Sequence, residues 1–169
     1  MTRGEIEAEL EAHHRAGFAW SLACCGRDRE EAEDVLQTAY LKILDGRAEF
    51  AGRSAFKTFL FGVIRRTASE ARRRRRFAGI FLSRPGRSRP EAVEDVPEER
   101  LALLDALARL PRRQREVLEL VFYVGLTVEE AGETLGVSAG SARVHYGRGK
   151  RAMARLLGIA APGTGASRG

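Results

Sequence analysis

Apolar residues recur about four positions apart through the first part of the chain, which is the period of an amphipathic helix. Residues 5–25 carry one such repeat and Gly26 follows it, so they predict a single helix that ends there. Asp28 and Glu31 have the spacing of a capping box, in which each side chain accepts an amide proton at the start of a helix. They predict that a second helix begins here and continues to Gly46.

A third apolar repeat begins after a loop at residues 45–53. Ser54 is positioned to cap this helix, which is expected to continue to Arg76. Phe56 and Phe59 have helical spacing within it, and aromatic residues at that spacing belong more often to a core than to an exposed stacking surface. We therefore expect a three-helix bundle in the first part of the chain, with Phe56, and by the same reasoning Phe59, in its core.

The periodicity is lost at residues 77–97, where serine, proline and glycine accumulate. This composition is typical of a flexible linker, and it divides the chain into two small helical domains. Residues 1–76 are expected to form the first domain, residues 98–158 the second, and the Gly/Ala-rich residues 159–169 a disordered tail. No segment shows the alternation of a strand and no internal repeat is present, so the predicted fold is all-α.

Four helices are predicted in the second domain. A leucine repeat marks the first helix, and Pro111 both ends it and begins the next. Thr127 and Glu130 form another capping box, which begins a short helix. A glycine turn at residues 136–138 separates this helix from the last one, at residues 139–157. This is the layout of a helix-turn-helix, whose second helix enters the major groove of DNA.

Charge is distributed unevenly along the chain, which has a net charge of +6. Residues 1–34 carry nine acidic and four basic side chains, whereas residues 62–76 carry seven arginines and one glutamate. Residues 137–157, which include the second helix of the helix-turn-helix, carry five basic side chains and no acidic one. Such basic segments indicate a polyanionic partner, and nucleic acid is the leading candidate.

The outer side of the last helix carries side chains that could reach bases or phosphates. A surface helix can also be basic simply because its outer face is solvated, and this alternative remains open for each residue taken alone. The acid-free stretch coincides with the turn, however, and this coincidence favours DNA contact. The candidate DNA-binding residues of this helix are Ser138, Ser141, Arg143, Val144, His145 and Arg148.

Motifs in both halves resemble those of the extracytoplasmic-function (ECF) group of the sigma-70 family. Residues 106–118 are similar to the start of the family's region 4, and residues 125–141 continue it. Residues 31–43 and residues 56–65 are similar to two segments of the family's region 2. The regions occur in the family's order, and the resemblance covers nearly everything from residue 7 to residue 157.

The resemblance implies a sigma factor, which binds core RNA polymerase and directs transcription initiation by recognising the -35 and -10 promoter elements and opening the DNA. Region 4 would contact the -35 element and the β flap, and region 2 the -10 element and the β′ clamp helices. The implied polymerase-binding residues are Asp34, Gln37, Thr38 and Lys42. Those implied in -10 recognition and melting are Arg53, Lys57, Arg65, Arg66, Arg72 and Arg73, with the loop at residues 48–53 as the pocket for an extruded base.

Four positions depart from the family's usual pattern. Thr38 stands where the family usually has an acidic residue, and Phe59 where it has a tryptophan. Arg66 stands in place of an asparagine, and His145 in place of a frequent arginine. The details of polymerase docking and of base preference therefore do not carry over from the family.

The resemblance also implies an inhibitory partner such as an anti-sigma factor. It implies that neither half of the chain catalyses a reaction. The sequence has no phosphate-binding glycine loop, nucleophile elbow or catalytic pair of acids, so we expect neither an enzyme nor a cofactor. Two alternatives remain open. A helix-turn-helix transcriptional regulator could bind operator DNA without being a polymerase subunit, and an interaction adaptor could carry the same basic surfaces without binding nucleic acid.

The histidine and cysteine residues of the first helix do not predict a metal site. If His13 and His14 lie on one helix with Cys24 and Cys25, the two pairs are roughly 16 Å apart, which is too far for one ion. Adjacent cysteines are also poorly placed for a mutual disulfide. No apolar run approaches the ~20 residues that span a bilayer, so we expect a cytoplasmic protein without membrane insertion.

Overall fold

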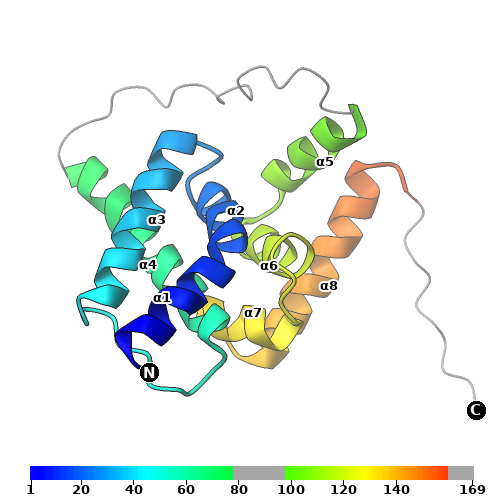
Figure 1. Ribbon diagram of the computed structural model, residues 1–169. Coiled ribbons are helices and arrows are strands. Elements are labelled where there is room, and N and C mark those ends of the chain that lie inside the picture. Colours follow the sequence, from blue (N-terminus) through cyan, green and yellow to red (C-terminus); the bar gives the residue numbers. More distant parts are fainter. Residues whose placement is uncertain (78–97, 160–169) are drawn as a thin grey trace, which may run out of the picture.

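The structure is a computed structural model that describes residues 1–77 and 98–159. All regular structure within these residues is α-helical and forms eight helices (Figure 1). The all-α prediction is therefore confirmed. The linker predicted at residues 77–97 lies outside the described residues except for Phe77, and the tail predicted at residues 159–169 except for Ile159.

Four helices, rather than the predicted three, form the first half of the chain. They are α1 (Arg3–Ala12), α2 (His14–Cys24), α3 (Arg29–Leu44) and α4 (Phe56–Phe77). The helix predicted at residues 5–25 is interrupted at His13, whose φ of -103° and ψ of 5° leave the helical region. The prediction was wrong here because apolar residues keep their four-residue spacing on both sides of the break, and because histidine is not a helix breaker.

The starts of α3 and α4 differ in part from the predicted caps. The Asp28 carboxylate accepts the amide of Glu31 at 2.9 Å, as predicted, but the Glu31 carboxylate pairs with Arg75 of α4 at 2.8 Å instead of completing a capping box. At α4 the carbonyl of Ala55 accepts the first helical amides. The Ser54 hydroxyl donates to that carbonyl at 3.3 Å, so Ser54 is not the cap.

Four helices form the second half, as predicted. They are α5 (Glu98–Arg109), α6 (Arg112–Phe122), α7 (Val128–Leu135) and α8 (Ala139–Leu156). Thr127 and Glu130 complete the predicted capping box at the start of α7. Gly136 ends α7 in the left-handed conformation, with a φ of 66°, which a residue without Cβ adopts without strain. The helices α7 and α8 with this turn form the predicted helix-turn-helix.

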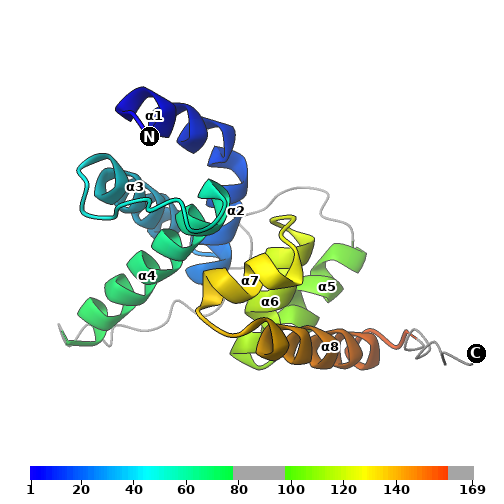
Figure 2. The same ribbon diagram turned by 90° about the horizontal axis from the view of Figure 1, so that it is seen from below.

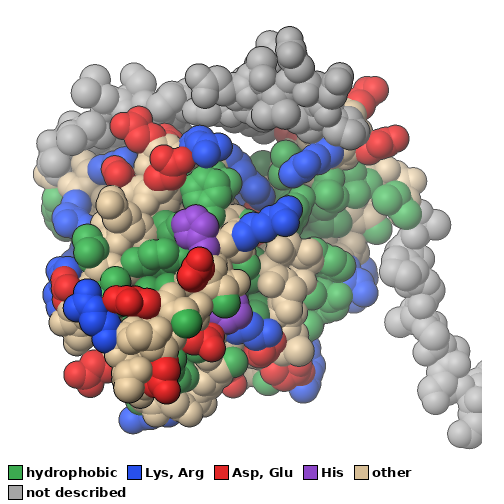
Figure 3. Space-filling model, in the orientation of Figure 1, with side chains coloured by type: hydrophobic (Ala, Val, Ile, Leu, Met, Phe, Trp, Pro, Cys, Tyr) green, Lys and Arg blue, Asp and Glu red, His purple; other side chains and the backbone are tan. Residues whose placement is uncertain are grey.

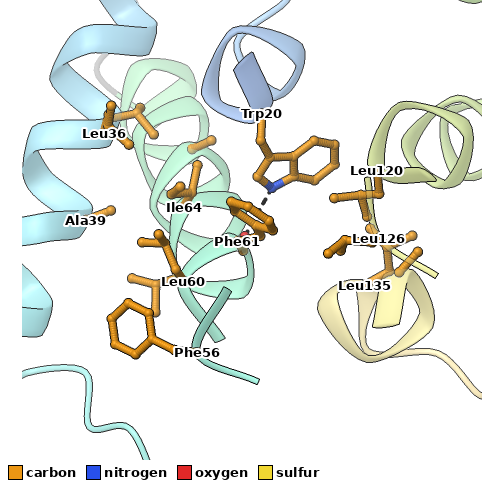
Figure 4. Packing of buried hydrophobic residues seen from close by; sticks show 14 of the residues in the cluster. Trp20, Leu36, Ala39, Phe56, Leu60, Phe61, Ile64, Leu120, Leu126 and Leu135 are labelled. Carbon is orange, nitrogen blue, oxygen red and sulfur yellow. Dashed lines mark hydrogen bonds between the residues drawn. The ribbon is translucent and has the colours of Figure 1, made fainter. Parts of the chain in front are cut away.

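One hydrophobic core joins the two halves. Trp20 of α2 and Phe61 of α4 point toward Leu120 of α6, toward Leu126 between α6 and α7, and toward Leu135 at the end of α7 (Figure 4). The Trp20 indole N–H donates to the Phe61 carbonyl at 3.1 Å, which satisfies a buried donor. The facing surfaces of the two halves are buried in this common core.

A smaller cluster holds α5 against the rest of the second half. Ala106, Leu107 and Leu110 pack with Leu118 of α6 and Met153 of α8. The helices α6 and α7 face α2 and α4, whereas α8 runs along the outer side of the second half (Figure 2). The fold therefore leaves the outer face of α8 exposed, while α7 covers part of α4.

Candidate nucleic-acid interface

The N-terminal end of α8 carries the predicted DNA-binding residues of the helix-turn-helix. The Ser138 hydroxyl caps the helix by accepting the Ser141 amide at 3.1 Å. Ala142 is fully buried where α8 packs on α7, so the opposite side of the helix faces outward. The exposed residues are Ser138, Ser141, Arg143, Val144 and Arg148, and His145 is half-buried.

Arg143 does not project freely into solvent. Its Nε and Nη2 atoms donate to Oε1 of Glu129 on α7, at 3.0 and 2.7 Å. A hydrogen bond from the backbone amide of Glu129 and the Arg143 guanidinium both lower the pKa of this carboxyl. Both side chains stay exposed, so the pair orients the guanidinium at the surface without burying it.

Aromatic and close backbone contacts fix α8 behind this surface. Tyr146 stacks on Phe122 of α6 with ring centroids 6.1 Å apart, and the Lys150 ammonium lies 5.0 Å from the Tyr146 centroid. Gly149 is buried, and a Cβ added there would lie 3.1 Å from the Leu118 side chain. Because α8 is held by these contacts, its polar outer face has a defined orientation.

The predicted DNA-binding residues of the first half divide into an exposed and a covered group. The exposed residues are Arg53, Arg66 and Arg73, and the partly buried ones are Lys57, Arg65 and Arg72. Arg65 and Arg72 line a cavity of about 20 Å³ against α6, which has room for about one water molecule. The structure therefore brings these six residues to one half of the molecule but does not leave all of them accessible.

Glutamates of the second half neutralise two of the covered residues. Lys57 Nζ lies 3.2 Å from Oε1 of Glu130, and Arg65 Nε lies 3.5 Å from Oε1 of Glu116. The pKa of Glu130 is lowered first by the hydrogen bond from the Thr127 amide and then by Lys57. These glutamates thus stand beside the α4 side chains that were predicted to hold phosphates.

Three phenylalanine rings meet at the loop predicted to hold an extruded base. The Phe50 centroid lies 5.3 Å from those of Phe56 and Phe59, which are 5.8 Å from each other. Phe56 is buried, as predicted, whereas Phe50 and Phe59 are half-buried. Phe50 was missed because it lies in a loop, where no helical period marks it.

The predicted polymerase-binding residues lie on α3. Asp34 and Gln37 are exposed, and Thr38 is half-buried. Lys42 Nζ lies 2.6 Å from a carboxylate oxygen of Glu70, so this side chain links α3 to α4 rather than extending into solvent. The structure thus leaves Asp34 and Gln37 as the accessible part of the predicted set.

An ion pair between the halves was also missed by the sequence reasoning. Arg27 Nη2 donates to Oε1 of Glu119 at 3.0 Å, and its guanidinium lies 5.6 Å from the Tyr123 centroid. The Glu119 side chain is 5% exposed, and burial raises its pKa although Arg27 acts in the opposite direction. The available signal was the presence of glutamates inside the apolar run at residues 116–121.

Cys24, the last residue of α2, and Cys25 after it are half-buried free thiols. Burial raises the pKa of both, to about 12 for Cys25, so both stay protonated at neutral pH and are weak nucleophiles. No group of three or more His, Cys, Asp or Glu side chains within residues 1–77 and 98–159 is arranged to hold a metal ion. None of the helices in these same two ranges is both long and apolar enough to cross a membrane.

Comparisons with known proteins identify both halves of the chain. The family description of Sigma-70 region 2 matches residues 10–78, and that of Sigma-70 region 4 matches residues 100–153. RNA polymerase sigma factor CarQ of Myxococcus xanthus is 31% identical over 153 residues, which are 89% of this chain and 88% of CarQ. The chain belongs to the sigma-70 family.

Further relatives place this sigma factor in the ECF group of the family. ECF RNA polymerase sigma factor ShbA of Streptomyces griseus is 35% identical over 147 residues, which are 80% of this chain and 74% of ShbA. ECF RNA polymerase sigma factor SigL of Mycobacterium tuberculosis is 29% identical over 165 residues, which are 91% of each chain. The prediction of a sigma factor that directs transcription initiation is therefore confirmed.

Two solved structures share the fold of this sigma factor. The sigma factor RpoE of Bartonella quintana, in complex with the anti-sigma factor NepR, has a TM-score of 0.71 at 23% identity, covering 92% of this chain and 98% of RpoE. CnrH, in complex with the cytosolic domain of CnrY, has a TM-score of 0.67 at 21% identity, covering 93% of this chain and 90% of CnrH. The helical architecture described above is thus one that sigma factors adopt.

Proposed function

We propose that this sigma factor recognises the -35 element of its promoters through α8 and the -10 element through α4. The proposal rests on the exposed basic end of the helix-turn-helix, at residues 138–148, in a chain whose first half matches region 2. A helix-turn-helix contacts base edges with the N-terminal residues of its second helix. The exposed residues lie at that end of α8, so their position suits docking in the major groove.

The proposed -35 contacts combine base reading with phosphate binding. Arg143 is pre-oriented by Glu129, and an oriented arginine can donate two hydrogen bonds to a guanine, which discriminates bases by about 1–3 kcal/mol. Phosphate contacts fix the register of such a helix on the duplex. The other residues proposed for this interface are Ser138, Ser141, Val144, His145 and Arg148.

At the -10 element we propose that bases are captured from opened DNA. Extruding a base costs a few kcal/mol, and stacking it on an aromatic ring returns about 1–3 kcal/mol. The half-buried ring of Phe50, within the loop at residues 48–53, and that of Phe59 beside it offer such a surface. The basic residues proposed to hold the phosphates are Arg53, Lys57, Arg65, Arg66, Arg72 and Arg73.

The proposed contacts with core polymerase use two surfaces. Asp34 and Gln37, with Thr38 beside them, present a polar face of α3 for the β′ clamp helices, and Lys42 supports this face through Glu70. Hydrophobic side chains gather over the second half of the molecule in Figure 3, which supports a further protein contact such as the β flap. In this proposal the polymerase supplies all the chemistry and the sigma factor none.

We also propose that a protein inhibitor holds this sigma factor inactive. RpoE and CnrH, which share its fold, were each solved with a protein partner, NepR and the cytosolic domain of CnrY. Exposed hydrophobic side chains of the second half, among them those of Leu101 and Phe122, could accept a partner of this kind.

Reconstituted transcription tests the proposed function. The purified chain is mixed with core RNA polymerase, complex formation is followed by gel filtration, and run-off transcripts are collected on genomic fragments. We expect a stable complex and transcripts that start at defined sites, each preceded by common -35 and -10 sequences. A chain that bound duplex DNA tightly but formed no complex with the polymerase would instead be a helix-turn-helix regulator, and the proposal would be wrong.

A further inference from the structure

The outermost line of residues on α8 begins with a glycine and a valine one turn apart. Gly140 and Val144 are both exposed, on the side of the helix opposite Ala142, which is fully buried against α7. Residues four apart lie one above the other on a helix, so these two share one line along its surface. Arg143 and Arg148 are exposed on either side of that line. Gly140 and Val144 therefore lie at the centre of the face that the proposed function turns toward DNA.

The fold does not account for a valine at position 144. Val144 is 48% exposed and belongs to neither hydrophobic cluster of the described residues. A β-branched residue also has a lower helix propensity than alanine. Because the χ1 angle of valine is restricted, its two methyl groups hold their position at the surface, and little side-chain entropy is lost when they contact a ligand. Val144 is therefore suited to an apolar contact with a partner outside the chain.

The packing of α8 does not require a glycine at position 140 either. Among the described side chains, a Cβ added to Gly140 would meet only the Ser138 hydroxyl oxygen, at an ordinary contact distance of 3.9 Å. Glycine also lowers the stability of a helix relative to alanine. A missing side chain does, however, let the backbone approach a ligand closely. A side chain as short as that of Val144 needs such an approach in order to reach the edge of a base.

Glu129 determines which edge of the Arg143 guanidinium is available. Nε and Nη2 of Arg143 both donate to Oε1 of Glu129, at 3.0 and 2.7 Å. The Glu129 carboxylate also accepts a hydrogen bond from its own backbone amide in the first turn of α7, so it is held in place. The second Nη2 proton and both Nη1 protons remain, and they lie at the outer end of the guanidinium. Donors on Nη1 and Nη2 together match the O6 and N7 acceptors of guanine.

We propose that α8 reads a guanine together with a nearby thymine in the major groove of the -35 element. The outer end of Arg143 donates to O6 and N7 of the guanine, and the methyl groups of Val144 contact the C5-methyl group of the thymine. Glu129 is a positioning residue, because it acts on DNA only through Arg143. The inference rests on the proposed function, in which α8 contacts the -35 element, and it adds two bases that this element must contain.

Base analogues in the promoter test both contacts in the holoenzyme reconstituted with core RNA polymerase. The promoter is one defined by run-off transcription, and each guanine and thymine of its -35 element is replaced in turn. Deoxyuridine removes only the C5-methyl group of thymine, and 7-deazaguanine removes only the N7 acceptor of guanine. Inosine keeps O6 and N7 and removes the amino group in the minor groove, so it is the matched control for guanine. Affinity is measured by competition with a fluorescein-labelled promoter duplex at one salt concentration.

We expect deoxyuridine at one thymine to weaken binding about fourfold and 7-deazaguanine at one guanine to weaken it about tenfold, with little effect of inosine. Val144→Ala should bind the thymine and deoxyuridine promoters equally, because alanine is too short to reach the methyl group. Glu129→Ala should lower the preference for guanine over 7-deazaguanine several-fold, because a free guanidinium can turn to a phosphate instead. Glu133→Ala makes the same charge change on an exposed residue of α7 that does not pair with Arg143, and it should keep the preference.

A further variant separates DNA contact from folding. Gly140→Ala should keep or raise the free energy of unfolding in urea and still weaken promoter binding, a combination that a purely structural role would not produce.

The outcomes distinguish this inference from the proposed function. Promoter binding that is insensitive to deoxyuridine at every thymine, or to 7-deazaguanine at every guanine, would overturn the inference and leave the proposed function intact. An unchanged preference for guanine in Glu129→Ala would overturn the positioning role. If the holoenzyme bound no promoter specifically, the proposed function itself would fail.

Discussion

Gly149 marks a close contact between α8 and α6. A Cβ at this position would lie 3.1 Å from Leu118 Cδ1 and 3.3 Å from the Cβ of Gln114. Leu118 is buried in the smaller core cluster, so it has little room to move away. Gly147 of the same helix faces only the flexible end of Arg151, at 3.6 Å. The two glycines look alike in the sequence, but close packing requires a glycine only at position 149.

The two glycines predict opposite effects of alanine. Gly149→Ala should destabilise the protein by about 1–3 kcal/mol, because overpacking against Leu118 outweighs the better helix propensity of alanine. Gly147→Ala should stabilise it by up to about 1 kcal/mol, because the added methyl group meets no fixed atom. Urea unfolding followed by circular dichroism measures both free energies. Equal effects of the two substitutions would show that propensity alone determines them.

Glu119 is a buried acid whose protonation changes with folding. Burial raises its pKa above the usual value of 4.5, although Arg27 lies 3.0 Å away. The folded protein then binds more protons at this residue than the unfolded chain does. The contribution of Glu119 to stability is therefore fully present below pH 4.5 and is lost as the pH rises through the pKa of the folded state.

Glu119→Gln should remove this pH dependence. Below pH 4.5 both side chains are neutral, so the two proteins should have similar free energies of unfolding. Above it the original protein should lose stability relative to the glutamine variant until the folded-state pKa is passed. Urea unfolding of both proteins from about pH 4 to about pH 8 gives the difference. A difference that grew in favour of glutamate with rising pH would contradict the raised pKa.

At the scale of the elements, the stability of α7 depends on the contacts at its two ends. It has 8 residues, and an isolated helix of that length is not stable in water. Thr127 and Glu130 satisfy its first amides, Gly136 reverses the chain at its end, and Ala131 and Leu135 bury its inner face. The position of α7, and with it the entry angle of α8, therefore rests on a few local contacts.

Loss of the α7 cap should be measurable. Thr127→Ala removes the side chain that accepts the Glu130 amide at 3.1 Å, and it should cost about 1 kcal/mol of unfolding free energy. Thr2→Ala removes a cap of the same type from α1 and is the matched control. It should cost less, because the exposed first turn of α1 can fray without unfolding the core. Urea unfolding of the two variants compares them directly, and equal losses would contradict this distinction.

Most helix ends that depend on local chemistry were predicted correctly, the start of α4 at Ser54 being an exception. The caps at Thr127 and Ser138 and the turn at Gly136 involve residues within four positions of each other. The Glu31 carboxylate pairs with Arg75, which is distant in the sequence, instead of with the nearby backbone amide of Asp28. The sequence does not show which of these two partners the carboxylate binds. The break at His13 was not predicted for a different reason: the apolar spacing continues across it.

At the scale of the whole molecule, the proposed function places the polymerase and the -35 element on separate surfaces. Asp34 lies on the outer face of α3, and Arg143 lies at the start of α8 on the second half. Asp34→Arg should weaken core binding. Arg143→Glu should leave core binding intact and weaken promoter recognition by about 1–3 kcal/mol. Gel filtration with core polymerase measures the first effect, and run-off transcription at increasing promoter concentration measures the second.

Charge-matched controls separate these effects from general electrostatics. Glu33→Arg makes the same charge change on an exposed neighbour of Asp34, and Arg151→Glu does so on α8 outside the proposed DNA surface. Both controls should behave like the original protein at the step concerned. If Asp34→Arg and Arg143→Glu failed at the same step, the division of labour between the two halves would be wrong.

The sequence by itself determined the helical class, most of the helix ends, the helix-turn-helix and the family. Each depends on residues a few positions apart or on the order of motifs along the chain. Only the tertiary structure decided that Glu116 and Glu130 face Arg65 and Lys57, and that one core joins the halves. A periodic pattern shows that a side chain is buried or that a surface is basic. It does not identify the partner across a contact, because that partner is brought near by the packing of distant helices.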